Sequence, residues 1–227
     1  MKTELIAMSP QYDPWESIHS RQKNGRNTLT SIEFTVTNLC NLRCEHCAVG
    51  DVLTMKESSE RIPLSLLLQR LDEIDSLETL SITGGEPMYN KSIIQEYIVP
   101  IFRYAHERGI RTQINSNLTL DLERYESILP FLDVLHISYN YLNAEDFYKV
   151  AYVHSSHPTS FAQAEKTFQR MVDNTIALAK KGVFVSAESL ISVHTAPILD
   201  QIHHQIKEMG CQRHEVHPLY LVILPVT

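Results

Sequence analysis

Three cysteine side chains stand close together early in the sequence. Cys40, Cys44 and Cys47 are spaced C-x3-C-x2-C within one short segment. Thiolate is a soft ligand that favours iron–sulfur clusters, copper(I) or zinc. Three thiolates on one loop can bind three irons of a cubane and leave the fourth iron without a protein ligand, open to a substrate or cofactor. We therefore interpret the segment as the binding site of a [4Fe–4S] cluster.

Two other interpretations of the cysteines stay open, a structural zinc loop and incidental buried thiols. A structural zinc site requires four ligands, and His46 is poorly placed to be one between Glu45 and Cys47. The fourth cysteine, Cys211, follows the helix-stopping Gly210 at the start of the last predicted strand. It is then at the wrong end of the sheet for this site, and we interpret it as a core thiol.

The elements that must position these cysteines alternate between strand and helix patterns. The predicted strands are 32–37, 79–83, 111–115, 133–139, 183–191 and 213–219, and the predicted helices are 63–75, 91–108, 121–130, 160–181 and 197–209. This alternation is typical of a parallel α/β protein, either a doubly wound sheet or a barrel segment. In both, sites form at the carboxyl ends of the strands, where the cysteines lie.

Two segments depart from simple alternation. Pro100 is expected to kink or divide the helix 91–108. The segment 141–160 is too long for a simple joint and is either a helical insertion or a flexible lid. The predicted organisation is a lead-in over 1–30 with a short helix near 14–22, a core domain over 31–220 and an apolar tail over 221–227.

The composition excludes several classes of protein. The chain has 227 residues, of which 43% are hydrophobic and 21% charged, as in a globular protein with a packed core. A formal net charge of −7 and the lack of a basic stripe argue against a nucleic-acid partner. No apolar run reaches the ~18 residues that a membrane-spanning helix needs, and the N-terminus lacks the pattern of a secretory signal. We therefore predict a cytoplasmic protein.

Two motifs together resemble those of the radical SAM superfamily. Cys40, Cys44 and Cys47 match its cysteine motif, and the run Gly84-Gly85-Glu86-Pro87 after the second strand resembles its GGE loop. The resemblance covers about 31–219 and implies an α/β fold, a partial (β/α)6 parallel barrel. It also implies two cofactors, the [4Fe–4S] cluster and S-adenosylmethionine (SAM), whose amino and carboxylate groups chelate the open iron.

The resemblance implies roles for the second motif and for His46. Backbone carbonyls of Gly84 and Gly85 would hold the SAM ammonium at close approach. Glu86 would orient or charge-balance the loop, and Pro87 would stiffen its exit. A bulky side chain at Gly85 is then expected to block SAM while leaving iron and sulfide in place. His46 stands where the family usually has an aromatic residue that shelters adenine. Taken alone, the glycine run is typical of a plain turn.

Further implied contacts stand at the ends of later strands. Ser116 and Asn117 resemble residues that contact the SAM carboxylate or ribose, and Ser138 resembles a serine after the fourth strand. Asn140 replaces the acid that is usual nearby. Glu188, in the fifth strand, would reach SAM or substrate if its side chain points inward. The alternative for these polar residues is ordinary capping of strand ends.

The implied reaction is reductive cleavage of SAM to methionine and a 5′-deoxyadenosyl radical, which abstracts hydrogen from an unknown substrate. The implied partner is a one-electron donor of the flavodoxin or ferredoxin kind. No residue of the chain is assigned as a catalytic acid or base. The alternative function is a truncated, inactive protein that binds a cluster or zinc.

More narrowly, the segments PQYDPW, TNLCNLRCEHCAVG and HEVHPLY resemble the YfkAB-type radical SAM proteins. Those chains are longer and carry a further C-x-C-x4-C motif, which is absent from the sequence up to Thr227. We therefore expect a truncated product whose last strand is an exposed edge. Such an edge predicts poor solubility or oligomers.

Overall fold

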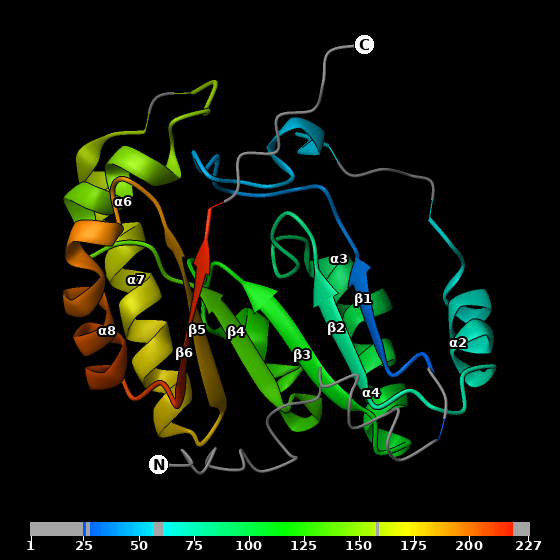
Figure 1. Cartoon of the computed structure of the whole chain (residues 1–227). Helices are drawn as coiled ribbons and strands as arrows, with labels where there is room; N and C mark the ends of the chain where they lie inside the picture. The colour runs from blue at the N-terminus through cyan, green and yellow to red at the C-terminus, as the bar shows by residue number, and fades with distance from the viewer. Residues whose placement is uncertain (1–24, 26–27, 57–60, 158, 220–227) are drawn as a thin grey trace, which may run out of the picture.

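Six strands and the helices that connect them make up the computed structural model, which describes residues 25, 28–56, 61–157 and 159–219 (Figure 1). The strands are β1 (Ser31–Thr35), β2 (Thr79–Thr83), β3 (Arg111–Ser116), β4 (Val134–Ser138), β5 (Phe184–Ile191) and β6 (Arg213–Pro218). The helices are α2 (Leu64–Asp72), α3 (Lys91–Ile93), α4 (Val99–Glu107), α5 (Glu123–Glu126), α6 (Ala144–Ala151), α7 (Phe161–Lys180) and α8 (Leu199–Glu208). None of the described helices is long and apolar enough to cross a membrane. The helix predicted near 14–22 and the apolar tail 221–227 lie outside the described residues.

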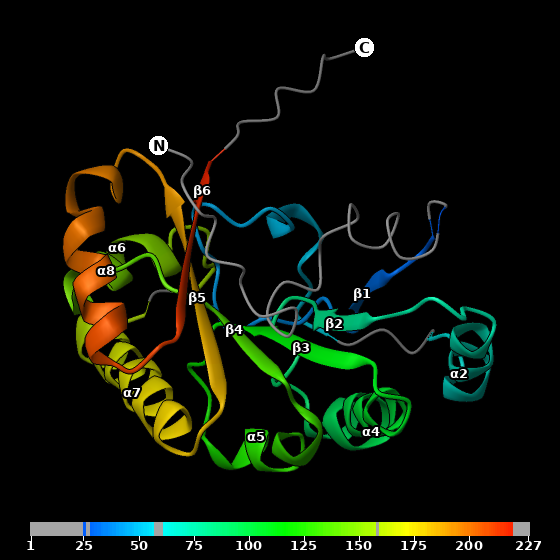
Figure 2. The ribbon, with the colours of Figure 1, turned by 60° about the horizontal axis from the view of Figure 1, so that its bottom comes forward.

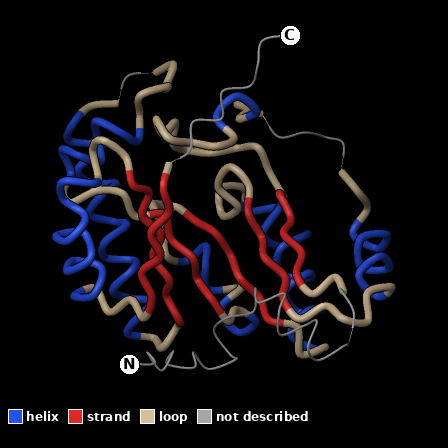
Figure 3. The backbone as a smooth tube through the Cα atoms, in the orientation of Figure 1, coloured by secondary structure: helices blue, strands red, loops and turns tan. Residues whose placement is uncertain are grey.

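The sheet is parallel throughout, with the strand order β1-β2-β3-β4-β5-β6. A doubly wound sheet reverses its strand order part-way, so this uniform order identifies a barrel-type sheet. Among the described strands, β1 and β6 each pair on one side only, and the barrel is therefore open (Figure 3). The predicted partial (β/α)6 barrel is confirmed.

The helices cover the convex face of the curved sheet (Figure 2). The strand residues that face these helices are apolar and fully buried: Leu80, Ile82, Ile114, Leu135, Ile137, Val185 and Ala187. Because side chains alternate between the two faces of a strand, the intervening residues point to the concave face. Many of these are polar: Gln113, Asn115, His136, Ser138 and Glu188. The convex face of the sheet is thus apolar and buried, and the concave face is largely polar.

The predicted helix 91–108 is divided before Pro100, as expected. α3 continues into a π-helical turn (Ile94–Ile98) and then into α4, which has Pro100 in its first turn. Proline has no N–H to donate, and its ring clashes with the carbonyl four residues earlier in a regular helix. A wider π turn directly before the proline accommodates both effects.

Two further predicted segments have a definite outcome. The helix predicted over 121–130 is shorter, because only α5 and a 3-10 turn (Leu129–Phe131) form there. The segment 141–160 contains α6, so the helical insertion is the correct one of the two alternatives. The side chain of Asn143 caps this helix by accepting hydrogen bonds from two backbone N–H groups of its first turn.

β6 is an open edge of the sheet. It pairs with β5 alone among the described strands, and Val216 and Leu219 are 38% and 39% exposed. Unpaired backbone groups beside apolar side chains can pair with another chain. We predict that the 227-residue chain self-associates and that Val216→Lys, which adds a charge to the edge, shifts it towards monomer. Light scattering over a concentration series measures this change.

Val193→Lys is the matched control for this edge. Val193 is 84% exposed but lies in the loop after β5 rather than on the open edge. The same charge at Val193 should leave self-association unchanged. A wild-type chain that is monomeric at all concentrations would contradict the prediction.

Candidate metal centre

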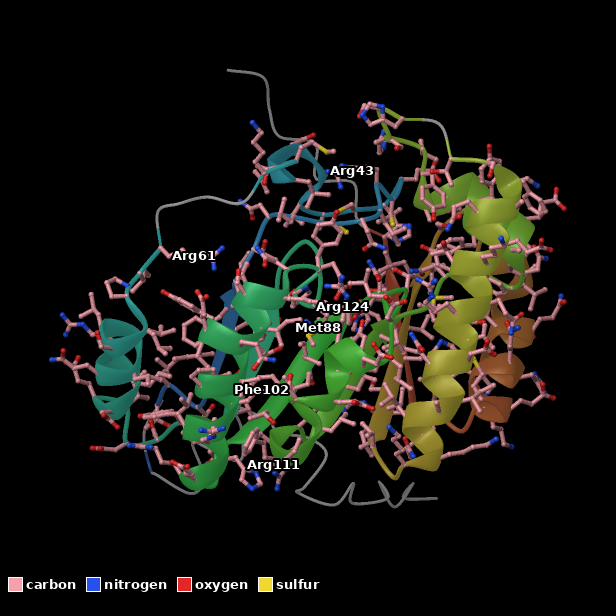
Figure 4. All side chains as sticks on the ribbon, turned by 180° about the vertical axis from the view of Figure 1, so that it is seen from behind. Arg43, Arg61, Met88, Phe102, Arg111 and Arg124 are labelled. Atoms are coloured by element: carbon pink, nitrogen blue, oxygen red, sulfur yellow. The ribbon has the colours of Figure 1, made fainter. Side chains whose placement is uncertain are left out.

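The cysteine loop, residues 37–54, follows β1 and crosses the carboxyl ends of the strands (Figure 1). Arg43 of this loop lies at one end of the molecule, and Arg111, at the start of β3, lies at the other (Figure 4). All three motif cysteines are partly buried in this loop. The metal-binding motif therefore lies at the edge of the sheet where parallel α/β proteins bind ligands.

The motif thiols are close enough to affect one another. The pKa values of Cys40 and Cys44 are raised to about 12, mainly by burial, with smaller contributions from the charge of Glu86 at Cys40 and from the neighbouring thiols at both. Both thiols are therefore protonated at neutral pH in the metal-free chain, and the positive charge of a bound metal is needed to ionise them. Cys211 precedes β6 and so lies at the amino ends of the strands, away from the other cysteines, as predicted.

The donor set suits a cluster better than a single ion. In the described part of the chain, no group of three or more His, Cys, Asp or Glu side chains is arranged to hold one metal ion. Three soft thiolates on one loop suit a cubane, in which each thiolate binds a different iron. Cys40, Cys44 and Cys47 therefore fit a [4Fe–4S] cluster.

Hydrogen-bond donors surround two of the sulfurs. Cys40 Sγ lies 3.4 Å from the backbone nitrogen of Leu42 and 3.8 Å from Nδ2 of Asn117. Cys44 Sγ lies 3.9 Å from the hydroxyl of Tyr141. Donors of this kind stabilise negative charge on a thiolate. Because Asn117 follows β3 and Tyr141 follows β4, several strand ends contribute to the centre.

The loop after β2, residues 84–87 and called the glycine loop below, is held tightly against the cysteine loop. The N–H of Gly85 donates to Thr37 O at 2.7 Å, and the N–H of Glu86 donates to Leu39 O at 2.7 Å. A Cβ at Gly84 would lie 2.6 Å from Thr37 O, and one at Gly85 would lie 2.3 Å from Leu39 O. Both glycines are therefore needed for contact between the two loops. The sequence had suggested only close approach of SAM.

Glu86 is a fully buried carboxyl that joins the end of β2 to the end of β3. Its Oε1 accepts hydrogen bonds from the Met88 N–H at 3.1 Å and the Ser116 hydroxyl at 2.9 Å, and its Oε2 accepts one from the Asn117 N–H at 2.7 Å. Burial raises the pKa of Glu86 to about 7, against the lowering effect of these hydrogen bonds. The hydroxyls of Ser116 and Tyr125 also hydrogen-bond at 2.8 Å.

Ser116 points to the helix-covered side of the sheet, and its predicted contact with SAM stays a prediction. Ser116 is buried, and its hydroxyl bonds Glu86 and Tyr125 on the helix-covered side of the sheet. Alternation along β3 turns Asn115, not Ser116, to the concave face. Pro87 is buried as well. Glu86 thus joins the loop after β2 to Ser116 and Asn117 at the end of β3. The roles of Glu86 and Pro87 in orienting and stiffening the loop stay predictions.

His46 contacts the segment after β4, near Glu188 of β5. Its Nε2 lies 3.3 Å from Nδ2 of Asn140, whose Oδ1 accepts a hydrogen bond from the Leu190 N–H at 2.7 Å. Glu188 Oε2 lies 2.8 Å from Nε2 of His136, and this hydrogen bond lowers the pKa of Glu188. Burial lowers the pKa of His46. At neutral pH this region therefore holds an ionised carboxylate and a neutral His46 ring.

The remaining predicted residues, Ser138 and Glu188, lie on or beside the concave face of the sheet. Ser138 is exposed at the end of β4, and Glu188 points to the concave side together with His136. From the sequence, contact of Glu188 with SAM or substrate was conditional on an inward-pointing side chain, and the side chain does point inward. Contacts of Ser138, Asn117, His46 and Glu188 with SAM stay predictions.

Sequence reasoning missed the support that α6 gives to the cysteine loop. The N–H of Arg43 donates to Ala151 O and the N–H of Glu45 donates to Val150 O, both at 2.9 Å. Carbonyls in the last turn of a helix lack partners within the helix, so α6 offers them to the loop on both sides of the middle cysteine. The length of the insertion directly after the fourth strand was the available signal.

Known proteins share this sequence pattern. The family model described as Radical SAM superfamily matches residues 34–209. YfkA of Bacillus subtilis is 51% identical over 219 residues, which are 96% of this chain and 58% of YfkA. A GTP 3′,8-cyclase of Helicobacter pylori is 33% identical over 89 residues, which are 38% of this chain and 27% of the cyclase. The chain thus spans 58% of the length of YfkA.

A solved structure shares the fold. The crystal structure of SuiB from Streptococcus suis bound to S-adenosylmethionine matches with a TM-score of 0.65 at 15% identity. The match covers 91% of this chain and 45% of SuiB. The likeness therefore extends over nearly all of this chain and less than half of SuiB.

We predict that Gly85→Ala loses the metal centre and not only SAM binding. The new Cβ would lie 2.3 Å from Leu39 O and 3.1 Å from Cys40 Cβ, so the cysteine loop would have to move. Iron and sulfide per chain after anaerobic reconstitution should fall well below the wild-type content. Gly50→Ala is the matched control, because its Cβ would meet Cys47 Cβ at an ordinary 3.7 Å. Full iron content in Gly85→Ala with lost SAM binding would restore the expectation drawn from sequence.

We also predict that Glu86 lowers stability as the pH rises. Its pKa is about 7 in the folded chain against an ordinary 4.5, so the folded state holds the proton more tightly than the unfolded state. The stabilising contribution is complete below pH 4.5 and is lost as the pH rises through about 7, by about 3 kcal/mol in total.

Glu86→Gln isolates this effect, because glutamine does not titrate. The free energy of unfolding of the wild type should fall between pH 5 and pH 8 by more than that of Glu86→Gln, measured by urea denaturation. Glu96→Gln, a change at an exposed carboxyl in the π-helical turn, should keep the wild-type slope. Parallel pH profiles for the wild type and Glu86→Gln would show that Glu86 has an ordinary pKa.

Proposed function

Because this chain belongs to the radical SAM superfamily, we propose that it binds a [4Fe–4S] cluster through Cys40, Cys44 and Cys47 and cleaves SAM reductively. The observation that carries the proposal is the contact between the glycine loop and the cysteine loop at the carboxyl ends of β1 and β2. This contact brings the two motifs that the reaction requires into one place. The bound cofactors supply a 5′-deoxyadenosyl radical that takes hydrogen from a substrate.

In this proposal the residues of the chain bind SAM and orient it. Backbone carbonyls of Gly84 and Gly85 are proposed to hold the SAM ammonium, since neither residue has a side chain in the way. Asn117, whose Nδ2 lies near Cys40 Sγ, is proposed to reach the SAM carboxylate. His46 is proposed to shelter the adenine, which its neutral ring allows without a charge.

The concave face is proposed to bind the substrate. Ser138 and Glu188 are on this face close to the carboxyl ends of the strands, and Gln113 and Asn115 are on it nearer β1. Amide, hydroxyl and carboxylate groups of this kind select a polar molecule. We leave the substrate unnamed, and the whole-protein activity of longer relatives is not carried over.

A reductant completes the proposed reaction. Cleavage of SAM consumes one electron, which we propose a flavodoxin- or ferredoxin-like protein delivers to the cluster. Thiols that must stay reduced and a cluster that must be reduced point to a reducing compartment. We therefore propose that the protein works in the cytoplasm.

The proposal is tested by anaerobic reconstitution of the wild type and of four single variants. The wild type should take up about four irons and four sulfides per chain, give the visible spectrum of a [4Fe–4S] cluster, and form 5′-deoxyadenosine from SAM with dithionite. Cys40→Ala, Cys44→Ala and Cys47→Ala should each lose the cluster. Cys211→Ala is the matched control and should keep it, since Cys211 lies at the other end of the sheet.

Two outcomes would contradict the proposal. Zinc without sulfide in the wild type would indicate the alternative of a structural metal-binding protein. A cluster that shows no SAM cleavage would indicate a protein that binds the cluster without turnover.

A further inference from the structure

We propose that Tyr141 is a positioning residue whose hydroxyl donates a hydrogen bond to Cys44 and thereby raises the reduction potential of the cluster. The inference rests on the proposed function, because it requires the cluster. It assigns a role to the insertion that contains α6. Nothing in the cysteine motif itself indicates this residue, which lies 97 positions further along the chain.

Tyr141 is buried, and among the described residues its hydroxyl has one hydrogen-bond partner, Cys44. The residue is 3% exposed, and the hydroxyl oxygen lies 3.9 Å from Cys44 Sγ, its one hydrogen-bond contact among the described residues. A buried hydroxyl that makes no hydrogen bond is costly, so this contact has a strong reason to form. A metal-bound thiolate has no proton, and therefore Tyr141 must be the donor.

The tyrosine ring is held in place by its own segment. The ring of Phe147, on α6, meets that of Tyr141 edge to face, with centroids 4.9 Å apart and planes at 82°. Phe147 is fully buried and also contacts Phe168 on α7. Edge-to-face pairs of buried aromatic rings favour one geometry. The hydroxyl is therefore directed at the sulfur by a packed aromatic group rather than by a free side chain.

The same insertion holds the backbone around Cys44. The carbonyls of Val150 and Ala151 accept hydrogen bonds from the N–H groups of Glu45 and Arg43, the two neighbours of Cys44 in the sequence. Cys44 is thus fixed through its backbone by the end of α6 and through its sulfur by Tyr141. A hydrogen bond at a position fixed in this way is maintained in both redox states.

The sign of the effect follows from charge. The reduced cluster carries one more negative charge than the oxidised cluster, and part of that charge lies on the thiolate sulfurs. A donor to sulfur therefore stabilises the reduced state more, which raises the potential. Loss of the donor should reduce the equilibrium constant for reduction roughly fivefold to tenfold, where tenfold corresponds to 59 mV for one electron.

The test compares Tyr141→Phe with Tyr139→Phe in anaerobically reconstituted protein. Tyr139, two residues before Tyr141, is also fully buried. Its hydroxyl has no hydrogen-bond partner among the described residues, so its removal takes no donor from the cysteines. The midpoint potential is measured by redox titration, followed by the electron paramagnetic resonance signal of the reduced cluster. Tyr141→Phe should have the lower potential at wild-type iron content, and Tyr139→Phe should match the wild type.

A second substitution keeps the proposal testable if Tyr141→Phe holds its cluster poorly. Site-specific 3-fluorotyrosine at position 141 is a stronger hydrogen-bond donor of nearly the same size, and it should raise the potential above that of the wild type. Equal potentials for the wild type and this variant, or for the wild type and a fully loaded Tyr141→Phe, would overturn the inference. A wild-type chain that takes up no cluster would instead overturn the proposed function, so the two failures are distinguishable.

Discussion

The site depends first on the contact between the loops that leave β1 and β2. Two backbone hydrogen bonds of 2.7 Å join these loops, and they can form because Gly84 and Gly85 have no Cβ. Glu86, the next residue, extends this connection to the end of β3 through its buried carboxyl. Three strand ends are therefore held together by main-chain and buried polar contacts, which fix positions more closely than long flexible side chains do.

The second support comes from the opposite side of the cysteine loop. α6 binds the backbone on both sides of Cys44, and Tyr141, just before α6, contacts its sulfur. The cysteine loop is thus held by the loop after β2 at Thr37 and Leu39 and by the α6 insertion on both sides of Cys44. A loop of irregular structure needs partners for its backbone groups. Here the loop after β2 donates to two carbonyls of the cysteine loop, and the end of α6 accepts from two of its N–H groups.

The strands and helices could be predicted from local patterns. In a strand such as β2, the residues that are buried against the helices are apolar and alternate along the sequence. The two motifs were readable for the same reason, since thiolate chemistry and the lack of a Cβ belong to single residues. The direction of Ser116 was not readable, because one step along β3 turns a side chain to the other face. The contact of α6 with the cysteine loop joins residues about 100 positions apart, and no local pattern records such a contact.

The two faces of the sheet differ in how their buried polar groups are partnered. On the convex face the apolar residues of the strands are fully buried against the helices, and Ser116 and Glu86 satisfy each other there. On the concave face His136 is buried, yet its Nδ1 has no hydrogen-bond partner among the described residues, while its Nε2 is held by Glu188. A buried polar atom without a partner costs about 1–3 kcal/mol unless water or a ligand supplies one. The Nδ1 atom of His136 is therefore a position on the concave face where a bound polar substrate would gain a hydrogen bond that the folded chain leaves unmade.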